Sequence, residues 1–99
     1  MTDKTLEILG LLQEECTDVI QLISKIRRNG LKAVDADGVT GLQLLEQEIA
    51  DIYLLVAVLI ETEVLNVDKL ESIVTQKAKE MAAIQQQQYP PEDNEVFIA

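Results

Sequence analysis

Apolar residues recur every three or four positions through the N-terminal part of the chain, which is the spacing of one helical face. These positions are Ile8, Leu12, Cys16, Val19, Ile23 and Ile26. The pattern predicts a helix from about Lys4 to Arg28. The pair Asn29-Gly30 follows directly, and both residue types accept the left-handed backbone that commonly ends a helix. We therefore expect the first helix to end there.

A second helix is expected to begin at Thr40 and to end near Glu63. The residues Thr40–Gln43 resemble a capping box, in which the first and fourth side chains each bond the other residue's backbone N–H. From Ile49 to Ile60 only Asp51 is strongly polar, and apolar side chains surround the whole circumference. Such a helix belongs in the middle of a bundle, and two partners from its own chain can hardly cover it. This segment predicts a homo-oligomer, either a dimer or a tetramer.

A third helix is expected to begin at Asp68, where Glu71 completes a similar capping pattern, and to run into the glutamines 85–88. Its apolar face carries Leu70, Ile73, Val74, Met81 and Ile84. Pro90 then ends the helix, because proline lacks a backbone N–H and disfavours a helical residue before it. We expect residues 89–99 to form a flexible, acidic and then apolar tail, either a disordered end or a tip that docks on a neighbouring subunit.

The fold class that follows is all-α, with one domain over residues 1–88. Each chain would contribute three long helices to a bundle, and oligomerisation would complete a four-helix-type core. A chain of 99 residues buries a limited share of its surface by itself, which also favours association with further copies.

Charge and composition exclude several classes of function. The net charge of −10 argues against proteins that grip the nucleic-acid backbone or dock on anionic membrane surfaces. The chain has no histidine, which removes Ser–His and Cys–His nucleophile pairs and most zinc sites. Cys16, the single cysteine, is expected in the core. With no disulfide, leader or membrane-spanning run, we expect a cytoplasmic protein.

Two pairs of acidic residues lie on apolar helix faces. With about 100° of rotation per residue, Glu48 and Asp51 project together from the apolar sector of the predicted second helix. Glu15 lies between apolar neighbours on the first helix, and Asp18 lies at the edge of the same face. An ionised carboxylate in an apolar interior costs several kcal/mol unless it is paired or binds a metal.

The two predicted helices are joined by a short loop, so they are expected to pack antiparallel. Because each acidic pair lies near the middle of its helix, this packing brings the pairs level and forms an oxygen-lined cluster. Such a cluster suits Mg²⁺, with Mn²⁺ as a possible substitute. The alternative is that these acids face solvent or pair with Lys25, Arg27 and Arg28.

The order of these acids resembles a known signature. The run EECTD from Glu14 to Asp18, followed by EIAD from Glu48 to Asp51, resembles the EExxE…ExxD signature of the MazG-like nucleoside triphosphate pyrophosphohydrolases. That family belongs to the all-α NTP pyrophosphatase superfamily, and the match covers about residues 6–60. Asp18 departs from the signature, because it stands where the family usually has glutamate, and the interval between the two runs is long.

The resemblance implies a Mg²⁺-dependent, oligomeric enzyme that hydrolyses a (d)NTP to the (d)NMP and pyrophosphate. The metal ligands that it implies are Glu15, Asp18, Glu48 and Asp51. Glu14 would be a further ligand or the catalytic base that orients water. Two alternatives stay open: a non-catalytic helical assembly or interaction protein, and the same fold acting on dUTP or phosphoribosyl-ATP.

Two lysines are candidates for contacts with substrate phosphate. Lys25 lies two turns beyond Asp18 on nearly the same stripe, and Lys77 lies within the apolar face of the predicted third helix. Each can equally be a surface lysine whose aliphatic stem covers apolar surface.

Overall fold

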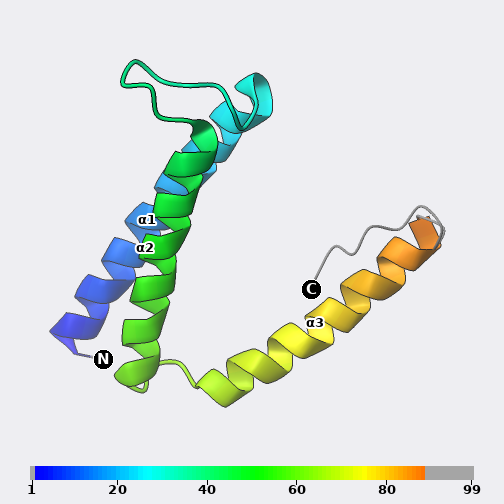
Figure 1. Cartoon of the computed structure of the whole chain (residues 1–99). Coiled ribbons are helices and arrows are strands. Elements are labelled where there is room, and N and C mark those ends of the chain that lie inside the picture. Colours follow the sequence, from blue (N-terminus) through cyan, green and yellow to red (C-terminus); the bar gives the residue numbers. More distant parts are fainter. Residues whose placement is uncertain (1, 89–99) are drawn as a thin grey trace. The chain divides into compact units, whose positions relative to one another are not determined.

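The computed structural model describes residues 2–88, and these form three helices (Figure 1). Helix α1 spans Asp3–Asn29, α2 spans Gly41–Glu61 and α3 spans Val67–Gln88. The described residues contain no β-strand, and only an isolated bridge joins Val34 to Thr40. The all-α class predicted from the sequence is confirmed.

Helix α1 ends close to where the sequence predicts. Gly30 follows the last helical residue with a φ of 90°, and its N–H donates to the carbonyl oxygen of Ile26 at 2.7 Å. A side chain would be strained at this φ, so glycine suits the position. At the other end, Thr2 caps the helix by accepting a hydrogen bond from the N–H of Thr5 at 3.0 Å.

The predicted capping box opens α2. The hydroxyl of Thr40 accepts from the N–H of Gln43 at 3.1 Å, and the Gln43 side-chain oxygen accepts from the N–H of Thr40 at 2.9 Å. The helix ends at Glu61, slightly before the predicted end near Glu63. Glu63 has a φ of 64°, a left-handed conformation that a right-handed helix cannot include.

Helix α3 starts one residue earlier than predicted, with a different cap. The side-chain oxygen of Asn66 accepts from the N–H of Lys69 at 2.9 Å. The prediction that Asp68 opens the helix is therefore wrong, and Asp68 lies in the first turn instead. Asparagine and aspartate cap equally well, so the local pattern alone did not separate the two positions.

Helices α1 and α2 form an antiparallel hairpin joined by residues 30–40 (Figure 1). Each is partly buried along one stripe. On α1 the stripe is Ile8, Leu12, Glu15, Val19, Leu22 and Ile26, and on α2 it includes Gly41, Leu44, Glu48, Ile52, Leu55 and Leu59. Leu59 is the one described side chain that is fully buried, at 2% exposure. An acidic residue thus occupies the middle of each packing stripe.

Contacts within the chain divide it into two units, one through Leu65 and one from Asn66 onward. The first unit contains the α1/α2 hairpin and the second contains α3. That residues 1–88 form a single domain stays a prediction, as does the completion of the core by oligomerisation. The predicted tail, residues 89–99, lies outside the described residues.

Cys16 is exposed, so the prediction that it belongs to the core is wrong for this chain. It directly follows Glu15, which places it about 100° around the helix from the stripe that α2 covers. The spacing of apolar residues therefore predicts the helix correctly, but the buried face that it predicts is wider than the one that α2 covers.

None of the helices within residues 2–88 is long and apolar enough to cross a membrane. The most apolar of them, α2, is interrupted by the charged residues Glu46, Glu48 and Asp51.

Gly41 lets the start of α2 approach the end of α1 closely. A Cβ at Gly41 would lie 2.9 Å from Cγ1 of Ile26 and 3.4 Å from the carbonyl oxygen of Leu31. We expect Gly41→Ala to lower the free energy of unfolding by about 1–3 kcal/mol, because this packing has no room for a methyl group. Urea unfolding followed by circular dichroism measures the change.

Gly10→Ala is the matched control, because no atom lies within 4 Å of a Cβ at Gly10. This replacement is expected to leave stability unchanged or raise it by up to about 1 kcal/mol, the difference in helix propensity. Equal effects of the two substitutions would contradict a close approach at Gly41.

Candidate metal centre

Three carboxylates meet in the middle of the α1/α2 hairpin. Glu15 comes from α1, and Glu48 and Asp51 come from α2. Each residue offers one carboxylate oxygen, and these three oxygens all lie within 4.8 Å of one another. Glu15 and Glu48 are partly buried, whereas Asp51 is exposed. The structure therefore brings together three of the four predicted metal ligands.

The helical repeat explains why these residues meet. Glu15 and Glu48 occupy the central positions of the two packing stripes, so the contact between the helices sets them face to face. Asp51 lies one turn after Glu48 and points from the edge of the same face. The cluster thus opens to solvent on the side of Asp51.

The cluster changes the acidity of Glu15. Its pKa is raised from 4.5 to about 7. The largest cause is a hydrogen bond with the side chain of Glu48, which favours the protonated form, followed by loss of solvent around the carboxyl group. The negative charges of Glu48, Asp51 and Asp18 act in the same direction. Near neutral pH the cluster therefore holds a proton that a cation would displace.

Two oxygens of the cluster lack a hydrogen-bond partner. Oε2 of Glu15 and Oε2 of Glu48 are shielded from solvent, and apart from the proton that the two carboxyl groups can share, no donor from another residue within residues 2–88 reaches either of them. A carboxylate oxygen that loses water and gains no donor destabilises the folded state. Pairing with basic side chains, the alternative considered from the sequence, is therefore not observed for these two oxygens.

The other predicted acids of the first run lie outside this group. Asp18 is exposed one turn beyond Glu15, near enough for its charge to raise the pKa of Glu15. Glu14 is exposed and is likewise not one of the three clustered acids. Both remain predicted participants, Asp18 as a ligand and Glu14 as the base or a further ligand.

The two candidate lysines occupy different units. Lys25 is exposed near the C-terminal end of α1, where it lines a pocket. Lys77 is exposed on α3, in the unit that begins at Asn66. Contact of either lysine with substrate phosphate stays a prediction.

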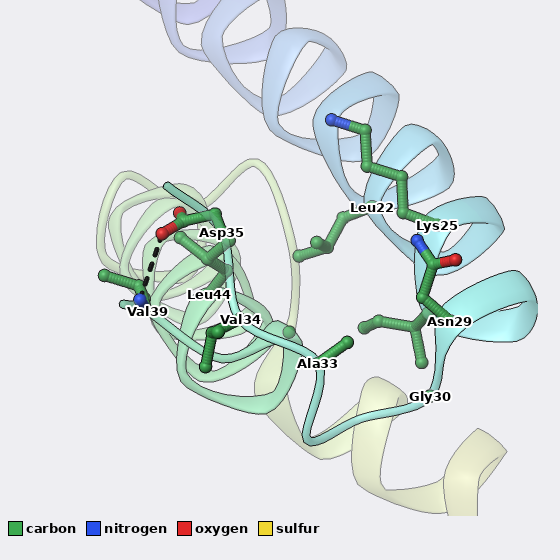
Figure 2. A pocket seen from close by; sticks show the side chains of 11 residues that line it. Leu22, Lys25, Asn29, Gly30, Ala33, Val34, Asp35, Val39 and Leu44 are labelled. Atoms are coloured by element: carbon green, nitrogen blue, oxygen red, sulfur yellow. Dashed lines mark hydrogen bonds between the residues drawn. The ribbon is translucent and has the colours of Figure 1, made fainter. Parts of the chain in front are cut away.

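A pocket of about 220 Å³ lies at the loop end of the hairpin (Figure 2). It is bounded by the end of α1, residues 30–40 and the start of α2. Among its polar residues are Asn29 and Asp35. The sequence marks Asn29-Gly30 as the end of the first helix and Asp37-Gly38 as part of the following loop, but neither signal indicates a pocket.

Asp35 holds the loop beside this pocket in shape. Its Oδ1 accepts hydrogen bonds from the N–H groups of Asp37 at 2.9 Å and Val39 at 3.0 Å. The Asp35 N–H in turn donates to the carbonyl oxygen of Val39 at 2.9 Å. The carboxylate therefore organises the loop backbone, as aspartate commonly does in turns.

The donor set of the cluster fits a hard divalent cation. It offers carboxylate oxygens without nitrogen or sulfur, which suits Mg²⁺ or Mn²⁺ rather than zinc or copper. Glu15, Glu48 and Asp51 would hold the ion. Mg²⁺ commonly keeps several of its waters and takes further oxygens from phosphate groups, which the exposed side at Asp51 allows.

Comparison of the chain with protein-family models, with curated proteins and with solved structures finds no match in any of the three.

Proposed function

We propose that this protein is a Mg²⁺-dependent nucleotide pyrophosphohydrolase that converts a (d)NTP to the (d)NMP and pyrophosphate. The observation that carries the proposal is the meeting of Glu15, Glu48 and Asp51, with two shielded carboxylate oxygens that no donor from another residue within residues 2–88 reaches. The order of the acids, which resembles the MazG-like signature, supports this function over other uses of a divalent cation.

The clustered carboxylates would hold and orient the metal ion. A Mg²⁺ ion held there would supply positive charge to the substrate phosphates and to the negative charge that develops on the leaving pyrophosphate. A chain with a net charge of −10 needs such a counter-charge to bind a polyanion. Glu15 would have to be ionised to hold the ion, since a carboxylate binds a metal in its deprotonated form.

Water attack at the α-phosphorus would form one P–O bond while the bond to the bridging oxygen breaks. The attacking water loses a proton, and the chain has no histidine to accept it. Glu14, an exposed acid next to the cluster residue Glu15, is the proposed base that orients this water and takes its proton. Pyrophosphate then leaves with the bridging oxygen.

A panel of (d)NTPs, with dUTP and phosphoribosyl-ATP included, tests this function directly. With Mg²⁺ present, at least one compound is expected to yield monophosphate and pyrophosphate in equal amounts, and EDTA is expected to stop the reaction. Mg²⁺ binding without turnover of any compound would favour the non-catalytic alternative. The preferred compound identifies the substrate.

Stability is expected to depend on pH and Mg²⁺ together. The folded chain holds the Glu15 proton more tightly than the unfolded chain, so without metal this group stabilises the fold below about pH 4.5. That contribution is lost as the pH rises through about 7. Because Mg²⁺ requires the ionised carboxylate, it should raise the melting temperature more at alkaline than at acidic pH.

Thermal unfolding at several pH values, with Mg²⁺ or EDTA, measures both effects. Glu15→Gln is the control, because it removes the titrating group and should flatten the part of the pH dependence that Glu15 causes. A Mg²⁺ effect on melting that is the same on both sides of neutrality would exclude Glu15 as a ligand.

We also propose that the protein is a cytoplasmic homo-oligomer, a dimer or a tetramer. Large apolar side chains remain exposed on both helices of the hairpin: Tyr53 is 73% exposed, Ile20 67% and Leu54 63%. Several large exposed apolar side chains on a small hairpin favour association with further copies. A non-catalytic helical assembly protein would also form oligomers. Nucleotide turnover, and not the oligomeric state, therefore distinguishes that alternative from the pyrophosphohydrolase.

A further inference from the structure

The last residue of α1 and the glycine after it form a pair that can react with itself. Asn29 ends α1, Gly30 follows with a φ of 90°, and both residues are exposed. The nitrogen of Gly30 is the atom that can attack Cγ of the Asn29 side-chain amide, and glycine has no side chain to shield that nitrogen. The sequence contains no other Asn-Gly pair.

The reaction is a deamidation that needs only water. A bond forms between the Gly30 nitrogen and Cγ of Asn29, and the side-chain nitrogen leaves as ammonia with the proton that the Gly30 nitrogen gives up. Water then opens the resulting cyclic imide. Attack of water at Cγ leaves aspartate with the ordinary main chain. Attack at the backbone carbonyl carbon leaves isoaspartate, whose main chain runs through Cγ.

One hydrogen bond opposes this reaction in the folded protein. The Gly30 N–H donates to the carbonyl oxygen of Ile26 at 2.7 Å. Ring closure requires the backbone of Asn29 to leave its helical conformation, which breaks this bond. Helix ends open locally at a low cost in free energy, because few contacts hold them. The fraying of the last turn of α1 is therefore expected to control the rate.

Asn66 provides a comparison within the same chain. Its side-chain oxygen accepts a hydrogen bond from the N–H of Lys69 at 2.9 Å, so the side chain is held as the cap of α3. The next residue is Val67, whose branched side chain crowds the backbone nitrogen. Both features slow the closure of the imide ring at Asn66.

A carboxylate at position 29 would weaken the loop end of the hairpin. The last carbonyl groups of a helix carry partial negative charge and repel an anion, although Arg27 and Arg28 in the last turn offset part of this repulsion. Isoaspartate also lengthens the main chain next to the junction where the N–H of Leu42 donates to the carbonyl oxygen of Leu31 at 3.0 Å. The isoaspartate form is therefore expected to lose the most stability.

We propose that Asn29 is a site of spontaneous deamidation, which fraying of the last turn of α1 permits and which weakens the loop end of the hairpin as the protein ages. The reacting groups are the Asn29 amide, the Gly30 nitrogen and water. The proposal is independent of the pyrophosphohydrolase function, because it involves neither the carboxylate cluster nor a nucleotide.

Incubation of the full chain at neutral pH, with and without urea, tests this site. Peptide mapping by mass spectrometry measures deamidation at Asn29 and Asn66, and circular dichroism measures the melting temperature of the fresh and the aged protein. Asn29→Gln, incubated in the same way, is the matched control. It keeps an amide at the position, but its longer side chain closes an imide ring far more slowly.

In the folded chain Asn29 is expected to deamidate at least about tenfold faster than Asn66, because only Asn66 is held as a helix cap and precedes a β-branched residue. Urea should raise the rate at Asn29 by no more than about tenfold, since a helix end is protected only weakly. The melting temperature of the wild-type protein should fall with age, whereas that of Asn29→Gln should stay constant.

Three results would overturn the proposal. If Asn29 stays intact in the folded chain but is lost in urea, the bond to Ile26 prevents the reaction in the native protein. If Asn29 and Asn66 deamidate equally fast, the end of α1 has no particular reactivity. If aged Asn29→Gln loses as much melting temperature as the wild-type protein, the weakening arises elsewhere in the chain.

Discussion

Glu48→Gln and Asp51→Asn are each expected to lower kcat/KM for the best nucleotide about a thousandfold or more, which corresponds to about 4 kcal/mol of lost transition-state stabilisation. Both residues belong to the group of three carboxylates whose oxygens lie within 4.8 Å of one another. An amide cannot replace a charged ligand on a divalent ion, so the loss falls on metal binding and on catalysis.

The same substitutions should leave the fold intact. Without metal, Glu48→Gln is expected to be at least as stable as the wild-type protein, because it removes a negative charge that raises the pKa of Glu15. Its Mg²⁺-induced rise in melting temperature should disappear. Circular dichroism and thermal unfolding separate this outcome from a loss of activity caused by misfolding.

Glu46→Gln is the control for both substitutions. Glu46 is exposed on α2, about 160° around the helix from Glu48, and it does not belong to the carboxylate cluster. Its removal should change activity little. Wild-type turnover in Glu48→Gln or Asp51→Asn would show that the substituted acid has no part in catalysis. Unfolding of both variants with and without Mg²⁺ would show that the acids are needed for the fold instead.

Leu54→Glu is expected to dissociate the oligomer and to raise the dissociation constant of the assembly a hundredfold or more. Leu54 is 63% exposed on α2, next to Tyr53 at 73%. A carboxylate buried without a partner in an apolar interface costs several kcal/mol, and about 1.4 kcal/mol corresponds to each factor of ten. Sedimentation velocity over a range of micromolar concentrations measures the shift.

Gln47→Glu introduces the same charge at a polar, exposed position of α2 and is expected to leave the assembly unchanged. Parallel behaviour of the two variants would show that net charge rather than apolar contact controls association. A wild-type protein that sediments as a folded monomer at these concentrations would refute the oligomer altogether.

Local sequence signals located the helices well. The capping box from Thr40 to Gln43 and the Gly30 position after α1 depend on residues a few positions apart, so the sequence alone carries them. The predicted start of α3 differs from the observed one because Asn66 and Asp68 are equally good caps. The end of α2 depends on the left-handed backbone of Glu63, a residue type for which that conformation is uncommon.

The part of the candidate site that the helical repeat determines could be predicted from the sequence. Glu15 and Glu48 occupy core positions of their helices, and antiparallel packing brings them together, as the spacing indicates. The exposure of Cys16 could not be foreseen, because it depends on how far α2 wraps around α1. The pocket beside Asn29 likewise depends on the path of residues 30–40, which periodicity does not describe.

The pairing of Glu15 with Glu48 sets the stability of the hairpin against the proposed activity at the same two positions. Every other member of the two packing stripes is apolar or is glycine. Leucine at both acidic positions would continue the apolar seam and yield a more stable hairpin with no place for a cation. Selection for thermal stability alone would therefore replace these two acids first, and the proposed metal site would be lost with them.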